Sequence, residues 1–157
     1  MKIFKSRLTI TALLISAFFV ALATSRSAQG QTTNFVYHPE LGGYLDSNTG
    51  LVWGNSCLRT FGTLTSWDYA QGTFLTRYRA LTGVAAWRQP TVSELQIAGA
   101  RGISTAVNLP ASGNYLYWTS EKRGKGHYAV EPSESYVELL GNGSAIDAIA
   151  VYQAFTP

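Results

Sequence analysis

The spacing of apolar residues in the middle of the chain predicts two helices. The first lies at residues 66–78, where one apolar residue recurs every three to four positions: Trp67, Ala70, Phe74 and Tyr78. This period places them on one face of a helix. Thr65, with Asp68 three residues later, resembles a capping box at its start, and Gly83 marks its end.

The second predicted helix follows a proline. Pro90 favours an extended conformation for the residue before it and cannot continue a helix from that side. Thr91 is well placed as the N-cap, and Glu94, three residues later, can reach back to the backbone N–H of Thr91. We therefore expect a short helix over residues 92–100, with Gly99 and Gly102 as alternative ends.

The remaining apolar positions favour strands. Two short strands are expected at 35–37 and 51–53, and the segment between them ends in a turn over residues 46–50, rich in Asp, Asn and Gly. Residues 54–64 are expected to form a loop. Four later strands are expected, two of them joined by a hairpin over "KRGKG" and the third paired with the second across "EPSE": residues 114–121, 127–132, 135–140 and 149–155. Short strands, two central helices and a late run of strands predict an α+β fold, with the helices near a small, mainly antiparallel sheet.

The first thirty residues have the pattern of a secretory signal peptide. Lys2, Lys5 and Arg7 precede an uncharged apolar run over residues 8–23, which small and polar residues follow. Cleavage after Ala23 or after Gly30 fits the small-residue rule. We favour Gly30, which leaves residues 31–157 as a single exported domain with no membrane segment.

The alternative for this segment is an uncleaved membrane anchor. The apolar run is shorter than the ~20 residues that a spanning helix needs. The final compartment beyond export is not predicted: periplasm, cell surface and extracellular space all fit.

Removing this segment reverses the sign of the charge. The chain has 12 Lys and Arg and 9 Asp and Glu. Four of the basic residues precede residue 31, so the expected domain has eight basic and nine acidic residues, a net charge of −1. A net charge of this sign argues against a general nucleic-acid-binding domain. The single cysteine, Cys57, cannot form an internal disulfide, and a buried, unreactive thiol is its expected state.

Five motifs occur in an order that resembles the Lcl C-terminal domain family, which is named for the C-terminal domain of a Legionella collagen-like adhesin. They are "DSNTGLVW" (46–53), "SWDYA" (66–70), "WRQPTVSELQ" (87–96), "YWTSE" (117–121) and "HYAV" (127–130). The segment at 87–95 also looks like part of the formylglycine-generating-enzyme-like domains. The resemblance implies a C-type-lectin-like fold and a binding or adhesion function. Gln89 departs from the family's usual leucine, and the last strand lacks its usual basic ending.

The motif residues are expected to be structural. Arg88 is expected to bond carbonyl groups or a carboxylate such as Glu94 or Glu121, because its planar fork of donors suits bridging. The tryptophans are expected in the core, where large aromatic side chains stabilise a domain that has no disulfide. The structural set is Trp53, Trp67, Trp87, Arg88, Pro90, Thr91, Glu94 and Trp118.

Catalytic and metal-binding patterns are weak. His38 and His127 lack zinc-ligand spacing, and neither a nucleophile elbow nor a phosphate-binding loop is present in the sequence. We therefore expect no catalytic residue, metal or cofactor. Two minor alternatives are an enzyme that uses Cys57 and calcium-dependent sugar binding through "EPS" at 131–133, which lacks its usual partner motif.

One local concentration of positive charge remains, in "EKRGKGH" at residues 121–127. We expect Lys122, Arg123 and Lys125 to contact an acidic or sulfated polysaccharide or cell-surface glycan, with Tyr117 or His127 adding a stacking or hydrogen-bonding contact. The alternatives are a solvated hairpin tip that discourages edge pairing and a structural envelope or matrix subunit without a glycan ligand. Oligomeric state is not predicted.

Overall fold

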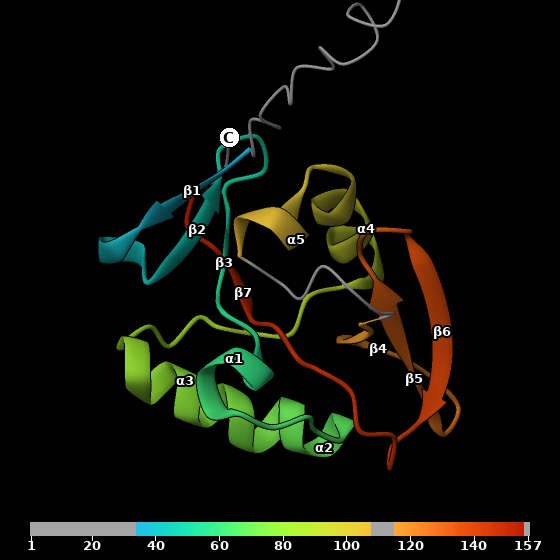
Figure 1. Ribbon diagram of the computed structural model, residues 1–157. Coiled ribbons are helices and arrows are strands. Elements are labelled where there is room, and N and C mark those ends of the chain that lie inside the picture. Colours follow the sequence, from blue (N-terminus) through green and yellow to red (C-terminus); the bar gives the residue numbers. More distant parts are fainter. Residues whose placement is uncertain (1–33, 108–114, 156–157) are drawn as a thin grey trace, which may run out of the picture. The chain divides into compact units, whose positions relative to one another are not determined.

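The computed structural model of the protein describes residues 34–107 and 115–155. All of them lie in the second of two compact units, Thr32–Pro157. The predicted signal peptide at 1–30 and the first residue of the strand expected at 114–121 lie outside the described residues. The fold is α+β, with two antiparallel sheets where the sequence analysis expects one (Figure 1).

The larger sheet joins the start of the described chain to its end. Its strand order is β1-β2-β3-β7, and all its pairs are antiparallel. The strands are β1 (Phe35–His38), β2 (Gly43–Asp46), β3 (Leu51–Trp53) and β7 (Val151–Gln153). The predicted strands at 35–37, 51–53 and within 149–155 are confirmed, whereas β2 was missed, since the sequence analysis expects no strand between residues 37 and 51.

The turn predicted at residues 46–50 is confirmed, and its geometry follows from its composition. The carboxylate of Asp46 accepts hydrogen bonds from the backbone N–H of Asn48 at 3.0 Å and from the hydroxyl of Thr49 at 2.9 Å. Gly50 adopts a φ of 69°, which glycine tolerates best. A single 3-10 turn, η1 (Pro39–Leu41), connects β1 to β2.

A continuous helix of 16 residues replaces the shorter predicted helix at 66–78. It consists of α2 (Trp67–Tyr69), a π-helical segment η2 (Ala70–Phe74) and α3 (Leu75–Thr82). The predicted N-cap is wrong by one residue: the hydroxyl of Ser66, not that of Thr65, accepts from the backbone N–H of Tyr69. The expected end is confirmed, since Gly83 closes the helix with a φ of 73°.

Two short helices were missed by the sequence analysis. The first, α1 (Cys57–Phe61), lies in the segment expected to be a loop, and Ser56 caps it by accepting from the backbone N–H of Arg59. The second, α5 (Ile103–Ala106), follows Gly102. Helices of four or five residues leave too few apolar repeats for a period to be recognised.

The second predicted helix is confirmed at its predicted bounds, as α4 (Val92–Ala100). Thr91 and Glu94 form the capping box: the Thr91 hydroxyl accepts from the Glu94 N–H at 3.1 Å, and the Glu94 carboxylate accepts from the Thr91 N–H at 2.8 Å. Neither glycine expected to end it serves as the C-cap, which is Arg101. Gly99 instead lies against the backbone of Pro132, where any side chain would overlap the Pro132 carbonyl.

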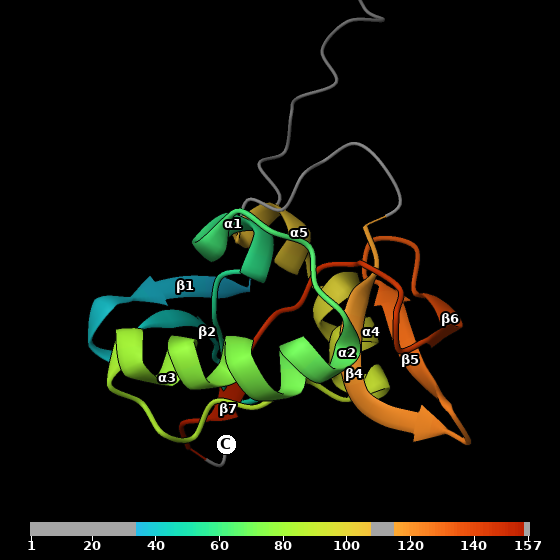
Figure 2. The same cartoon turned by 90° about the horizontal axis from the view of Figure 1, so that it is seen from below.

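The second sheet is a three-stranded antiparallel meander, β4-β5-β6. Its strands are β4 (Tyr117–Arg123), β5 (Gly126–Glu131) and β6 (Tyr136–Gly141), so both expected pairings in this region are confirmed. Figure 2 shows the β4–β5 hairpin extending beyond the helices and the other sheet.

Both faces of the larger sheet are buried at its centre. Leu51, Trp53 and Val151 pack on the α4 and α5 side, while Val52 and Tyr152 pack on the side of the 16-residue helix. This explains why β3 is buried at every position instead of alternating. Figures 1 and 2 show the helix lying beneath this sheet.

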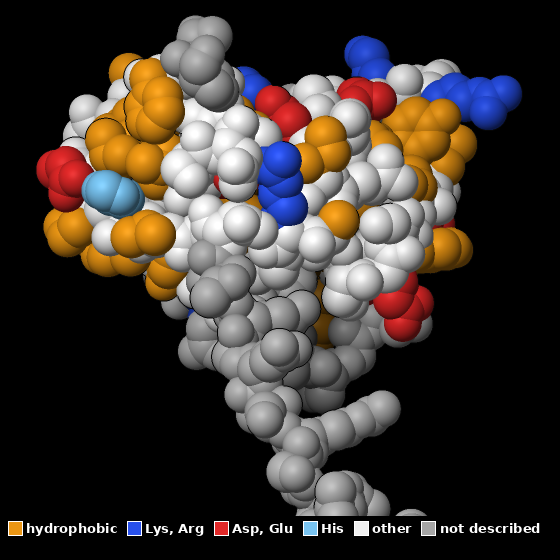
Figure 3. Space-filling model, turned by 90° about the horizontal axis from the view of Figure 1, so that it is seen from above, with side chains coloured by type: hydrophobic (Ala, Val, Ile, Leu, Met, Phe, Trp, Pro, Cys, Tyr) orange, Lys and Arg blue, Asp and Glu red, His pale blue; other side chains and the backbone are white. Residues whose placement is uncertain are grey.

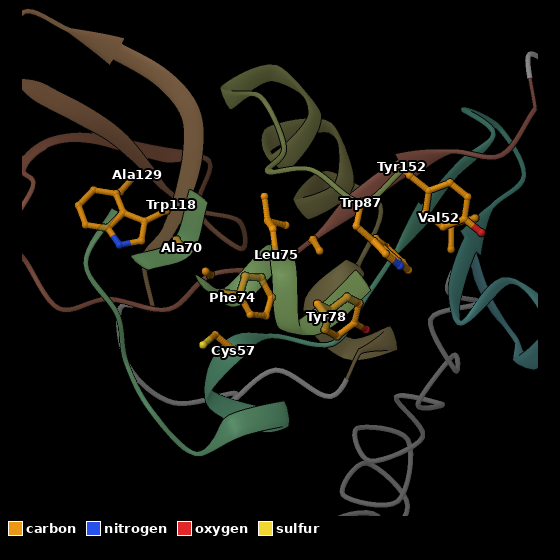
Figure 4. Packing of buried hydrophobic residues seen from close by; sticks show 12 residues of the cluster. Val52, Cys57, Ala70, Phe74, Leu75, Tyr78, Trp87, Trp118, Ala129 and Tyr152 are labelled. Atoms are coloured by element: carbon orange, nitrogen blue, oxygen red, sulfur yellow. The ribbon is translucent and has the colours of Figure 1, made fainter. Parts of the chain in front are cut away.

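The core on the helix side contains a row of aromatic rings (Figure 4). Trp87 meets Tyr78 edge to face at 5.1 Å and Tyr152 at 4.6 Å, and its indole N–H donates to the hydroxyl of Thr82 at 2.8 Å. Trp53, Trp87 and Trp118 are fully buried. The predicted core position is confirmed for these three tryptophans. Within the described residues, no helix combines the length and apolar character needed to cross a membrane.

Candidate functional site

Arg88 bonds a carboxylate and a carbonyl group, the two kinds of partner expected for it from the sequence. Its two terminal nitrogens donate to both carboxylate oxygens of Glu94, at 2.6 and 2.8 Å, and one of them also donates to the carbonyl of Gln89 at 3.1 Å. Its backbone exchanges two hydrogen bonds of 2.9 Å with Val151. Arg88 therefore ties α4 to the edge of β7; the bond to Glu94 is the one that the sequence analysis expects, whereas the pairing with Val151 was not predicted.

The same junction reaches the second sheet. The backbone N–H of Ser120 donates to the carbonyl of Pro90 at 2.8 Å, and the Val92 N–H donates to the carboxylate of Glu121 at 2.9 Å. Glu121, the other carboxylate considered for Arg88, binds the first turn of α4 instead. These contacts fix β4 where it leaves the core.

At the same point, β4 contains an irregularity. Trp118 pairs with Ala129 and Lys122 pairs with His127, so three residues of β4 lie opposite the single Tyr128 of β5. A bulge of this kind bends its strand and increases its twist. It directs the outer part of the hairpin away from the core.

The hairpin closes with a two-residue turn, Gly124–Lys125, between the paired Arg123 and Gly126. Gly124 has a φ of 60° and Lys125 has no positive φ. A glycine in this conformation at the first central position is typical of a type II′ turn, whose twist matches that of the strands. The turn therefore holds its basic residues on an ordered strand pair.

Lys122, Arg123 and Lys125 are all exposed at this tip. Among the residues that the structure describes, none of the three side chains forms an ion pair or a hydrogen bond; the ion pairs there are His38–Glu40, Arg88–Glu94 and Arg101–Asp46. Figure 3 shows Lys and Arg side chains standing out at the edge of the surface, with hydrophobic side chains beside them. The tip thus presents three cations that form no ion pair with a carboxylate of the described residues.

The aromatic partners expected for these cations lie elsewhere. Tyr117 is 1% exposed and packs in the core against α4. Burial, with the nearby Asp147 carboxylate, raises the pKa of its hydroxyl. A surface contact through Tyr117 is therefore wrong, because β4 enters the core before it reaches the tip.

His127 is also buried, with 8% of its surface exposed. Its ring stacks on Trp67 at 3.9 Å and meets Trp118 edge to face at 6.4 Å. Burial lowers the pKa of His127, Asp68 opposes that effect, and Lys122 adds to it. The contact expected between His127 and a glycan is not available at this ring, because it is buried against the half-buried Trp67 of α2.

The strand register separates the tip into two faces, because directly opposed residues project to the same side. On one face lie Lys122, His127 and Leu140. On the other lie Arg123 and, two positions inward on β5, Tyr128, which pairs with Leu139 of β6. Tyr128 is half-buried and Leu139 is 46% exposed.

Tyr128 and Leu139 were missed as candidate site residues by the sequence analysis. The alternation within "HYAVE" carries the signal, since it places Tyr128 opposite in direction to His127. That alternation says which residues share a face but not which of them stay exposed. Exposure depends on how far toward the tip α2 and α4 cover each face.

The other candidate chemistry is placed apart from the tip. Cys57 is fully buried at the start of α1, and burial raises its pKa to about 11. The Glu131 carboxylate accepts hydrogen bonds from the hydroxyl of Ser133 and the backbone N–H of Glu134, and so closes its own turn. Over the described ranges, no group of three or more His, Cys, Asp or Glu side chains is arranged to hold a metal ion.

Comparisons of this chain with protein-family models, with curated proteins and with solved structures find no match. The likeness to the Lcl C-terminal domain family therefore rests on the order of the five sequence motifs.

Proposed function

We propose that this protein is an exported, non-catalytic binding protein with a C-type-lectin-like fold, and that the tip of its β4–β5 hairpin holds an acidic polysaccharide. The observation that carries the proposal is the tip itself. Three exposed cations stand at an ordered hairpin tip, in a domain whose expected net charge is −1, and no carboxylate of the described residues pairs with them.

The geometry suits a polymer better than a small molecule. A projecting hairpin offers a convex surface, whereas small-molecule sites are concave and mostly apolar. Sulfate and carboxylate groups repeated along a polysaccharide can meet several cations at once, and arginine pairs with such groups through two parallel hydrogen bonds. The order of motifs that resembles an adhesin domain supports the same class of function and the same fold.

The test is binding of the protein to immobilised dextran sulfate, with unsulfated dextran as the matched surface. Binding to the sulfated polymer is expected to weaken as salt rises, because the Debye length falls from ~10 Å at 0.1 M to ~3 Å at 1 M. A variant that changes Lys122, Arg123 and Lys125 to Ala is expected to lose most of this binding while it keeps its melting temperature, since these side chains make no described contact.

The control is Arg77→Ala, which removes one exposed cation from the 16-residue helix and is expected to leave binding unchanged. A triple variant that binds as tightly as the original would overturn the proposal. Binding that ignores salt and disappears with a calcium chelator would favour the "EPS" segment instead. A protein that binds neither polymer would favour a structural subunit.

A further inference from the structure

We infer that only one face of the hairpin holds the polysaccharide: Tyr128 is the platform for a sugar ring, and Arg123, not Lys122, binds the acidic group of that sugar. This inference rests on the proposed function and narrows it to a face, a residue pair and a saccharide ligand.

The first argument is the register. Arg123 of β4 pairs with Gly126 of β5, and Tyr128 lies two residues beyond Gly126 on β5. Arg123 and Tyr128 are therefore diagonal neighbours on one face. Diagonal neighbours in an antiparallel ladder are about 7–8 Å apart, within the reach of aromatic and long side chains. Arg123 can therefore place its guanidinium at the rim of the Tyr128 ring.

The second argument is what surrounds Tyr128. On β5 and β6, the positions of this face that lie nearest the tip are Gly126 and Gly141, which pair with each other and carry no side chains. The Leu139 side chain leans over Gly126, and the space above Gly141 is open. The face thus combines a half-buried aromatic ring, a partly exposed aliphatic side chain and, at Gly141, backbone that no side chain covers.

This combination fits a saccharide. The C–H face of a sugar ring packs on an apolar aromatic surface, while its hydroxyl and acidic groups remain at the rim. The hydroxyl of Tyr128 makes no hydrogen bond with the described part of the chain, so it is free to serve as the polar edge of such a platform. Arg123 supplies the paired donors for a sulfate or carboxylate.

The third argument is the state of the opposite face. Lys122 shares its face with His127, whose ring is covered by Trp67. The aromatic surface on that side is therefore already occupied by the protein. Lys122 contributes charge to the tip but has no exposed ring beside it.

The experiment compares two sulfated polymers, one with sugar rings and one without: dextran sulfate and polyvinyl sulfate. Tyr128→Leu retains an apolar side chain but removes the ring, and is expected to weaken binding to dextran sulfate about fivefold, as for the loss of one aromatic contact. It is expected to leave binding to polyvinyl sulfate unchanged. Tyr128→Phe, which keeps the ring, is expected to bind dextran sulfate within about twofold of the original.

Arg123→Gln and Lys122→Gln form the matched pair, because each removes one cation from the same strand end. Arg123→Gln is expected to weaken dextran sulfate binding about fivefold and Lys122→Gln less than twofold, in the range of exposed charge pairs. All variants are made in the protein expressed from its full-length sequence, and their melting temperatures are compared so that a loss of fold is not read as a loss of contact.

Equal losses for Lys122→Gln and Arg123→Gln, with no effect of Tyr128→Leu, would overturn this inference and leave the proposed function standing. A Tyr128→Leu variant that loses both polymers equally would also overturn it. Absence of binding by the original protein to dextran sulfate, or preference for anionic lipid vesicles over it, would overturn the proposed function as well.

Discussion

The contact between Arg88 and Glu94 yields a prediction about stability that depends on pH. Glu94 accepts from both terminal nitrogens of Arg88 and from the backbone N–H of Thr91, and its side chain is 21% exposed while that of Arg88 is 42% exposed. Glu94→Gln keeps an acceptor for Thr91 but removes the charge. Glu94→Ala also removes the acceptor for the Thr91 N–H, which is the Glu94 half of the capping box.

The expected cost follows from the kinds of hydrogen bond lost. Hydrogen bonds to charged groups contribute about 1.5–3 kcal/mol, and partial exposure to solvent places this pair at the lower end. We therefore expect Glu94→Gln to lower the free energy of unfolding by about 1.5 kcal/mol. Loss of the hydrogen bond from the Thr91 N–H adds about 1 kcal/mol, so Glu94→Ala is expected to cost about 2.5 kcal/mol.

The pH dependence separates the ion pair from simple packing. Burial alone would raise the pKa of Glu94, but the hydrogen bonds from Arg88 and Thr91 outweigh it, and the pKa lies below its ordinary value of 4.5. A carboxyl whose pKa is lowered on folding contributes stability above its unfolded pKa and loses it as the pH falls through its folded pKa. The difference between the original protein and Glu94→Gln should therefore be full at pH 7 and shrink below pH 4.5.

The assay is urea unfolding followed by tryptophan fluorescence, at pH 7 and at steps down to pH 3. Glu121→Gln is the matched control, because Glu121 accepts a single hydrogen bond in the first turn of the same helix and pairs with no described cation. It is expected to cost about 0.5 kcal/mol. A Glu94→Gln variant within 0.5 kcal/mol of the original at pH 7, or a difference that does not change with pH, would refute the reasoning.

Four further predictions concern Cys57, two glycines and Gln89. Cys57 is expected to resist alkylation by iodoacetamide at pH 8 until the protein is unfolded, since its pKa of about 11 leaves little thiolate; rapid labelling of the folded protein would contradict this. Gly99→Ala is expected to destabilise the protein by more than about 2 kcal/mol, because its methyl group would overlap the Pro132 carbonyl. Gly72→Ala, which meets open space in a helix, is expected to stabilise it by about 1 kcal/mol in the same urea assay; equal signs for the two would be inconsistent with this packing. The side-chain amide of Gln89 is buried without a partner among the described residues, so Gln89→Leu is expected to raise the free energy of unfolding by about 1 kcal/mol, and a loss of stability would count against it.

The sequence by itself determined the elements whose cause is local. Thr91, Glu94 and Pro90 are sufficient to predict α4 at its bounds, because a capping box and a proline act within a few residues. The Asp46 turn and the β4–β5 and β5–β6 pairings follow in the same way from turn residues and alternation. The partner of Arg88 also lies only six residues away along the chain.

Tertiary structure decided what depends on residues distant in sequence. β2 is a strand because β1 and β3 pair with both its edges, although its glycines favour a turn. The Cys57–Phe61 helix is held by a contact across 89 residues, from the Leu58 N–H to Asp147, which no local pattern reveals.

The candidate site shows the same division. The charge of the tip was evident from Lys122, Arg123 and Lys125 in the sequence. Which aromatic ring accompanies them was not, because burial is decided by packing. Trp67 covers His127 on one face of the hairpin, and on the other face α4 and the core cover Tyr117 but leave Tyr128, nearer the tip, half-exposed. Period-two alternation assigns residues to two faces of a sheet, but only the helices that pack against those faces determine which positions on each face meet solvent.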